Sequence, residues 1–169
     1  DSSDLVVVSP DAGGAKRADA LAKELKAGLA IMSKKRDKPG VVARMTLVGD
    51  VKDKTCVIVD DMVDTAGTLT RAASELMQAG AKDVYASAVH GVLSDPAIDR
   101  INKSPIKEFI VTDTIPMDEN EKRCSKMRVL SVAPLLAEAV KRIHTGGSLS
   151  NLFRDVPGKD STGGKWSLD

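Results

Sequence analysis

The chain has 169 residues, which is enough for one domain with a proper hydrophobic core. Its 25 Lys and Arg residues balance its 24 Asp and Glu residues, and only 2% of the residues are aromatic, so a nucleic-acid-binding surface is not expected. No apolar run approaches the ~18 residues of a membrane-spanning helix and no signal peptide is visible, which together predict a soluble, cytoplasmic protein.

The first part of the chain alternates short apolar strands with a segment of helical periodicity. The expected strands are Leu5–Ser9, Leu29–Ser33, Arg44–Val48 and Thr55–Val59. Between the first two, residues 16–26 place alanines and leucines on one helical face, and Gly28 follows as a stop signal. The polar segment Lys34–Val42 contains Pro39-Gly40 and is interpreted as an exposed loop.

The second part of the chain continues this alternation. The expected helices are Thr68–Ala79, a short one from Pro96 to about Asn102 with proline at its first position, and Ala133–Ile143; the expected strands are Val84–Val89, Phe109–Thr112 and Val129–Val132. Such alternation predicts an α/β fold with a mainly parallel central sheet and helices on both faces. We expect one domain over residues 1–153 and a flexible Gly- and Ser-rich tail over 154–169.

The run Thr55–Thr70 is the most informative part of the chain. An apolar strand leads to two adjacent carboxylates, Asp60 and Asp61, and then to Asp64-Thr65-Ala66-Gly67-Thr68 at the start of a helix. A helix N-terminus attracts phosphate, small residues let it approach, and carboxylates suit the vicinal hydroxyls of a sugar. The plainer alternative is that Asp64 and Thr65 are ordinary helix caps. The run matches neither a P-loop nor a dinucleotide-binding fingerprint.

Three other segments are weaker candidates on residues alone. Asp11, in the turn Ser9–Gly14, is either a Mg²⁺ ligand or the acceptor of an ordinary Asx-turn. Lys34 and Arg36 fall on the same side of an extended segment and could clamp a charged transition state, although a charge run is usually a solvated hairpin tip. Gly147–Asn151 has the composition of a linker. His90, His144 and Cys56 are interpreted as structural.

The segment Asp60–Thr68 resembles the ribose-5-phosphate loop of the phosphoribosyltransferase superfamily. Residues 6–153 as a whole resemble the C-terminal half of the ribose-phosphate pyrophosphokinase family, which implies a type I phosphoribosyltransferase-like fold. The segments that carry this narrower resemblance are SPDAGGAKR (9–17), ARMTLVGDVKDKT (43–55), VHGVLSDPAIDRI (89–101), TDTIP (112–116) and SLSNLF (148–153).

The resemblance implies a reaction in which the diphosphoryl group of ATP is transferred to ribose 5-phosphate, giving 5-phosphoribosyl 1-diphosphate and AMP with Mg²⁺ as cofactor. It also implies residue roles. Lys34 and Arg36 are the implied catalytic residues, Asp11 the implied magnesium ligand, and Ser148 and Ser150 part of an implied regulatory site for phosphate or ADP; the implied ribose-5-phosphate ligands are Asp60, Asp61, Asp64, Thr65, Ala66, Gly67 and Thr68.

The family's assembly leads to further expectations. The resemblance implies a homo-hexamer built from dimers, with much of the ATP site in an N-terminal half that we expect to be absent from this chain. We therefore expect the chain alone to bind ribose 5-phosphate weakly and to have no turnover. Two alternatives remain, namely a non-catalytic regulatory subunit of the same complex and a salvage phosphoribosyltransferase. A DNA-binding regulator on this fold would need a basic helix-turn-helix, which the sequence lacks.

Overall fold

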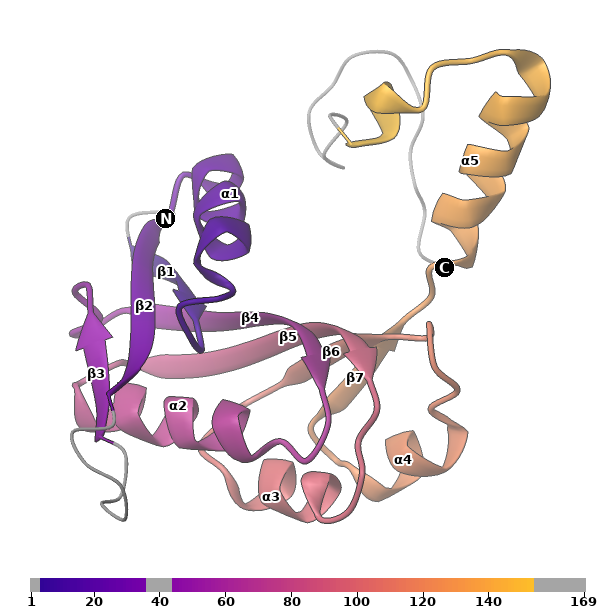
Figure 1. Cartoon of the computed structure of the whole chain (residues 1–169). Coiled ribbons are helices and arrows are strands. Elements are labelled where there is room, and N and C mark those ends of the chain that lie inside the picture. The colour runs from indigo at the N-terminus through magenta and orange to yellow at the C-terminus, as the bar shows by residue number, and fades with distance from the viewer. Residues whose placement is uncertain (1–3, 36–43, 154–169) are drawn as a thin grey trace. The chain divides into compact units, whose positions relative to one another are not determined.

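A seven-stranded sheet forms the centre of the computed structural model, which describes residues 4–35 and 44–153 (Figure 1). The strand order is β3-β2-β1-β4-β5-β6-β7, and every neighbouring pair is parallel except β2 and β3. The strands are β1 (Leu5–Ser9), β2 (Gly28–Lys35), β3 (Arg44–Val48), β4 (Thr55–Val63), β5 (Asp83–Gly91), β6 (Phe109–Thr112) and β7 (Met127–Leu130). The expected α/β fold with a mainly parallel sheet is confirmed.

The chain divides into two units, Asp1–Leu130 and Ser131–Asp169. The first holds the sheet with α1 (Ala15–Leu25), α2 (Gly67–Gln78), α3 (Ala97–Lys103) and α4 (Asp118–Arg123); the second holds α5 (Ala133–Thr145) and the 3-10 helix η2 (Ser150–Phe153). The expected domain limit at residue 153 stays a prediction, and the expected tail 154–169 lies outside the described residues. No helix of the described ranges is long and apolar enough to cross a membrane.

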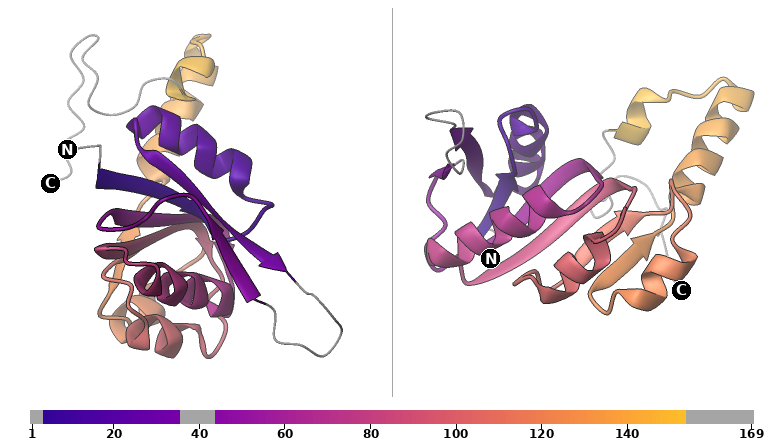
Figure 2. Two further views of the ribbon diagram at one scale, coloured as in Figure 1. Left: turned by 90° about the vertical axis from the view of Figure 1, so that its left-hand side faces the viewer. Right: turned by 60° about the horizontal axis from the view of Figure 1, so that its bottom comes forward.

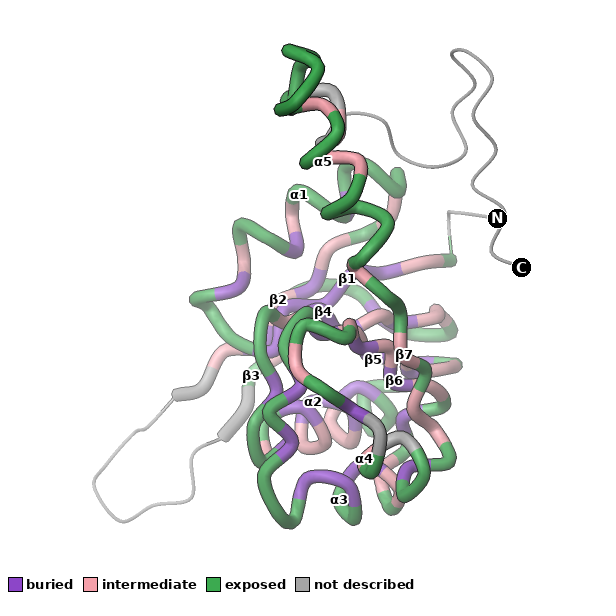
Figure 3. Tube along the Cα trace, turned by 90° about the vertical axis from the view of Figure 1, so that its right-hand side faces the viewer, coloured by how far each residue is buried: buried purple, intermediate pink, exposed green. Residues whose placement is uncertain are grey.

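Helices cover both faces of the sheet in the first unit. Figures 1 and 2 show α1 on one face and α2, α3 and α4 on the other. Ala18 and Ala22 of α1 pack against Val7 and Val59, while α2 and α3 pack into a larger cluster that includes the fully buried Phe109. Burial on both faces explains why the central strands are continuous apolar runs rather than alternating ones. Figure 3 shows buried residues concentrated along these strands.

Three strands, β2, β4 and β5, extend further than their apolar residues predicted, and β5 runs from Asp83 to Gly91 instead of from Val84 to Val89. β4 runs on to Val63, with Met62 paired to His90 and Val63 to Gly91 of β5. Asp60 and Asp61 therefore belong to the strand, and the expected strand end at Val59 is wrong. The difference arises because strand pairing needs only backbone groups, so it continues into polar positions where one face meets solvent.

The β2–β3 hairpin gives a second correction. Lys34 and Lys35 pair antiparallel with Met45 and Arg44, so both lysines lie in a strand and not in the loop that the polar composition predicted. Arg36 lies outside the described residues. The remaining differences are small: β7 begins and ends two residues earlier than expected, Pro96 precedes α3, and α4 was not expected because its residues have no apolar periodicity.

Candidate functional site

The candidate site lies where the order of the strands reverses. From β1 the chain crosses over through α1 to β2 on one side, and from β4 it crosses through α2 to β5 on the other side. The loops after β1 and β4 therefore start from adjacent parallel strands and diverge at the carboxyl edge of the sheet. Such a switch point is where open α/β sheets bind their ligands.

The loop after β1 is a tight turn organised by Asp11. The Gly14 amide donates a 2.9 Å hydrogen bond to Asp11 Oδ1, and the buried Ser9 hydroxyl donates to the Asp11 carbonyl at 2.6 Å. A Cβ on residue 14 would lie 2.7 Å from Ser9 Oγ, so the turn requires glycine there. Asp11 thus has the local turn role that was the plainer alternative, and its role as a metal ligand stays a prediction.

The acidic pair at the end of β4 is held by one arginine of α1. Arg17 Nη2 lies 2.9 Å from Asp61 Oδ2, and Arg17 Nη1 lies 3.5 Å from Asp60 Oδ1. The Asp61 amide also donates to Asp60 Oδ1 at 2.9 Å. Asp60 is the more enclosed of the two, with 22% of its side chain exposed against 64% for Asp61. Arg17 therefore joins the element that follows β1 to the acidic pair on β4.

The two carboxyls of this pair differ in acidity. Burial, reinforced by a side-chain hydrogen bond with Asp61 and by the charges of Asp61 and Asp11, raises the pKa of Asp60 from 3.8 to about 6. The pKa of Asp61 is lowered by its hydrogen bond with Asp60 and by the charge of Arg17. One carboxyl of the pair therefore stays ionised while the other gains its charge near neutral pH.

This difference predicts a titration that NMR of the Asp side-chain carboxyl carbons can measure. Asp60 should titrate near pH 6, and Asp61→Asn should lower its pKa because the variant removes a like charge and frees Arg17. Since the folded-state pKa lies above the ordinary 3.8, the stability that Asp60 contributes is complete below pH 3.8 and is lost as pH rises through about 6.

Asp50→Asn is the matched control for that titration. Asp50 is an exposed aspartate that pairs with Lys54 at 2.9 Å, and it is not among the groups that shift the pKa of Asp60. The Asp60 titration should be unchanged in Asp50→Asn. An Asp60 midpoint that stays near 6 in Asp61→Asn would contradict the coupling of the two carboxyls.

The loop after β4 presents an open helix N-terminus. α2 begins at Gly67, its cap residue Ala66 has φ 56° and ψ 12°, and no side chain caps the helix. The Thr70 hydroxyl donates to the Ala66 carbonyl at 2.8 Å, which fixes the first turn. The alternative in which Asp64 and Thr65 act as helix caps is therefore wrong. Asp64, Thr65 and Thr68 beside the start of α2 are exposed, and the first amides of a helix have no partner within the helix.

Comparison with known proteins decides the family. The sequence model described as "Phosphoribosyl synthetase-associated domain" matches residues 32–154. A curated ribose-phosphate pyrophosphokinase of Caldanaerobacter subterraneus subsp. tengcongensis is 55% identical over 150 residues, covering 89% of this chain and 47% of the relative. The chain belongs to the ribose-phosphate pyrophosphokinase family.

Two further comparisons agree with this membership. A ribose-phosphate pyrophosphokinase of Clostridium acetobutylicum is 49% identical over 154 residues, covering 91% of this chain and 48% of the relative. The crystal structure of phosphoribosylpyrophosphate synthetase from Mycobacterium smegmatis superposes with a TM-score of 0.77 at 44% identity, over 86% of this chain and 46% of that chain. The chain spans about half the length of the ribose-phosphate pyrophosphokinases it matches.

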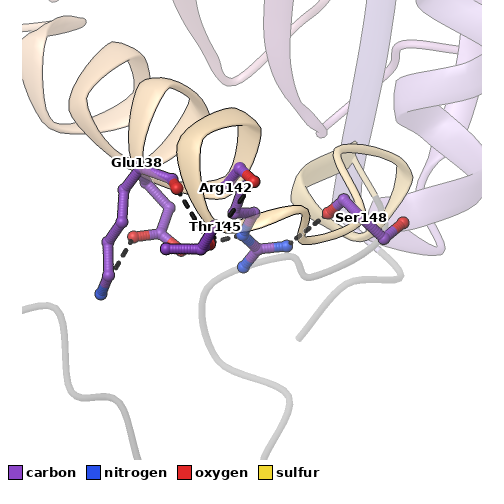
Figure 4. Close-up of polar contacts among 5 residues, drawn as sticks. Glu138, Arg142, Thr145 and Ser148 are labelled. Atoms are coloured by element: carbon purple, nitrogen blue, oxygen red, sulfur yellow. Dashed lines mark hydrogen bonds and ion pairs between the residues drawn. The ribbon is translucent and has the colours of Figure 1, made fainter.

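The remaining residues that the family resemblance singled out lie in two different parts of the chain. Lys34 lies on β2, beyond the last β1–β2 pair, Ser9 with Ile31. Ser148 and Ser150 belong to the second unit, where the Ser148 carbonyl accepts a 3.1 Å hydrogen bond from Arg142, which also bonds Glu138 (Figure 4). The Gly147–Asn151 segment therefore follows helix α5 and not a strand, and its regulatory role stays a prediction.

Sequence reasoning missed two arginines at the site. Arg17 contacts Asp60 and Asp61, and Arg100 of α3 donates from Nη1 to the Thr65 carbonyl at 2.8 Å. Both residues lie in segments that carried the family resemblance, and this was the one, weak indication in the sequence that they could belong to the site. Nothing in the residue pattern connects position 100 with position 65, because only the packing of α3 beside α2 brings them together.

Proposed function

We propose that this chain provides the ribose-5-phosphate site and a catalytic basic residue pair of an enzyme that transfers the diphosphoryl group of ATP to ribose 5-phosphate. One observation carries the proposal: the uncapped N-terminus of α2 stands next to the acidic pair of β4 at the switch point of a family member's sheet. A helix N-terminus suits the phosphate end of ribose 5-phosphate, and a neighbouring acidic pair suits its hydroxyl end.

Different residues of the proposed site bind ribose 5-phosphate and assist the transfer of the diphosphoryl group. The amides of Gly67 and Thr68 and the hydroxyls of Thr65 and Thr68 receive the 5-phosphate, and Asp60 and Asp64 accept hydrogen bonds from the ribose hydroxyls. In the transfer, the C1 oxygen bonds to the β-phosphorus of ATP, the bond from that phosphorus to AMP breaks, and the hydroxyl proton is released. Lys34 and Arg36 then stabilise the charge that develops on the transferred phosphoryl oxygens.

A magnesium ion fits this donor set through Asp11. Within residues 4–35 and 44–153, no three His, Cys, Asp or Glu side chains converge to hold a metal on their own. Mg²⁺ typically uses one or two carboxylates together with substrate phosphates, so Asp11, whose charge acts on the carboxylate of Asp60, suits a substrate-borne ion. The ion would neutralise phosphate charge, and Asp11 would hold and orient it.

The assembly and its effectors extend the proposal. We expect the full-length protein to form a homo-hexamer built from dimers, with phosphate or ADP bound near Ser148 and Ser150. Two features of the second unit fix the backbone near Ser148. The Arg142 guanidinium donates to the Ser148 carbonyl, and Gly146 ends α5 in the left-handed region at φ 71°. Sedimentation of the full-length protein with and without phosphate tests the assembly.

Ligand binding by the 169-residue chain tests the proposed site directly. In a calorimetric titration, ribose 5-phosphate should bind weakly, ribose should not bind measurably, and inorganic phosphate should compete. Incubation of the chain with ATP, Mg²⁺ and ribose 5-phosphate should produce no AMP, because the chain spans only about half the length of its relatives. Equal binding of ribose and ribose 5-phosphate would contradict the phosphate cradle.

The product assay separates the proposal from its alternatives in the full-length protein. AMP formed from ATP in step with 5-phosphoribosyl 1-diphosphate supports diphosphoryl transfer. Consumption of a free nucleobase together with that diphosphate would instead identify a salvage phosphoribosyltransferase. Neither reaction, with ribose 5-phosphate binding intact, would favour the regulatory subunit.

A further inference from the structure

Arg100 reaches the ribose-phosphate loop from a different helix. It lies in α3, and its Nη1 donates a 2.8 Å hydrogen bond to the carbonyl of Thr65, thirty-five positions earlier in the chain. If residue 67 carried a Cβ, that atom would lie 3.5 Å from Arg100 Nη1 and 3.8 Å from Thr65 Oγ1. The guanidinium therefore lies alongside the first residue of α2, where the 5-phosphate is proposed to bind.

The loop that Arg100 contacts contains one residue, Ala66, in an unfavourable backbone conformation. Ala66 has a positive φ of 56°, which costs a non-glycine residue about 1 kcal/mol or more, and its side chain is buried with only 4% exposed. On the helix side, the Thr70 amide and hydroxyl hold the Ala66 carbonyl at 3.0 and 2.8 Å. On the other side, Arg100 holds the Thr65 carbonyl, so the strained residue is fixed from both ends.

The charge of Arg100 is not neutralised by an acidic side chain. Among the described residues its one polar partner is the Thr65 carbonyl, whereas Arg17, Arg123, Arg128 and Arg142 each lie within ion-pair distance of a carboxylate. A hydrogen bond from a charged donor is stronger than a neutral one. An arginine that only stabilised the fold would do so more strongly with a carboxylate partner. An arginine beside a phosphate-binding loop attracts phosphate more strongly when no carboxylate neutralises its charge.

We propose that Arg100 is a positioning residue of the ribose-phosphate loop, which holds the Thr65 carbonyl and with it the loop conformation that receives the 5-phosphate. This inference rests on the proposed function and deepens it. Arg100 acts mainly through the loop, by fixing the peptide that precedes Ala66. Its unpaired charge adds a second, smaller contribution, because it raises the local potential where a dianion enters.

Arg100→Met and Lys103→Met in the 169-residue chain form a matched test. Both variants remove one positive charge from α3, but Lys103 is exposed and it is Arg100 that bonds the Thr65 carbonyl. We expect Arg100→Met to raise the Kd of ribose 5-phosphate at least about tenfold, the effect of losing a hydrogen bond with a charged donor, and Lys103→Met to change it less than about twofold. Arg100→Lys should recover part of the affinity.

Two further measurements separate positioning from folding and from simple charge. Hydrogen exchange of the amides at residues 65–68 should accelerate in Arg100→Met without ligand and stay unchanged in Lys103→Met, at equal melting temperatures. The affinity ratio of parent to Arg100→Met should persist at high salt, where a purely electrostatic role would be screened.

The outcomes distinguish the inference from the proposed function. Loss of ribose 5-phosphate affinity with faster exchange at residues 65–68, both confined to Arg100→Met, supports the inference. Unchanged affinity in Arg100→Met while the parent chain binds ribose 5-phosphate overturns the inference alone. A parent chain that binds no ribose 5-phosphate overturns the proposed function, and the inference with it.

Discussion

Gly49→Ala should destabilise the chain by about 3 kcal/mol or more, because it combines an unfavourable backbone conformation with overpacking. Gly49 follows β3 with φ 124°, a value that L side chains rarely adopt. An added Cβ would lie 2.8 Å from the Leu29 carbonyl oxygen and 2.9 Å from Ala30 Cα, both backbone atoms of β2. Neither atom can move aside without disturbing the pairing of β2 with β1. Thermal and denaturant unfolding of the purified variant measure the effect.

Gly80→Ala is the control that separates the two causes. Gly80 also has a positive φ, 90°, but a Cβ there would meet only Lys52, at 3.5 Å or more. This variant should lose about 1–2 kcal/mol, the cost of a left-handed conformation without a clash. Equal losses in both variants would show that the contact with β2 is relieved by movement. Loss of β3 alone would appear as faster amide exchange at residues 44–48.

Much of this fold could be predicted from the sequence because apolar content and strand pairing coincide in its centre. Val6, Val7 and Val8 face buried clusters on both sides of the sheet, so the strand is apolar throughout and its limits are visible. The prediction of strand ends failed where backbone pairing continues beyond the apolar residues. Lys34 and Asp60 are polar but still lie in strands β2 and β4. This is possible because the hydrogen bonds between strands join backbone groups and do not require apolar side chains.

The candidate site also has some features that the sequence could predict and others that it could not. The strand, loop and helix start around Asp64–Thr68 could be predicted because the pattern is local, while phosphate binding by this loop stays a prediction. Arg17 and Arg100 could not, because their roles exist only after α1 and α3 have packed next to the loops. Burial is the largest cause of the raised pKa of Asp60, and neither it nor the smaller effect of Asp11 is visible in a local pattern, unlike the effect of the adjacent Asp61.

Lys34 is the residue whose replacement should cost most in catalysis. β2 runs parallel to β1, and Lys34 lies beyond the last β1–β2 pair, so its backbone projects from the same carboxyl edge as the loops after β1 and β4. A lysine at this edge can meet charge that develops on a phosphoryl group bound at the switch point. Because that charge is largest in the transition state, Lys34 should act on kcat more than on substrate affinity.

Lys34→Ala in a protein of the relatives' full length should therefore lower kcat about a hundredfold to a thousandfold, with the KM for ribose 5-phosphate nearly unchanged. Lys35→Ala is the matched control, since it removes the same charge from the next position of β2 and strand alternation predicts that neighbouring positions differ in role. Its kcat should fall less than about threefold by the same alternation argument. Full activity in Lys34→Ala would revive the regulatory-subunit alternative, and equal losses in both variants would mean that the hairpin acts through its total charge.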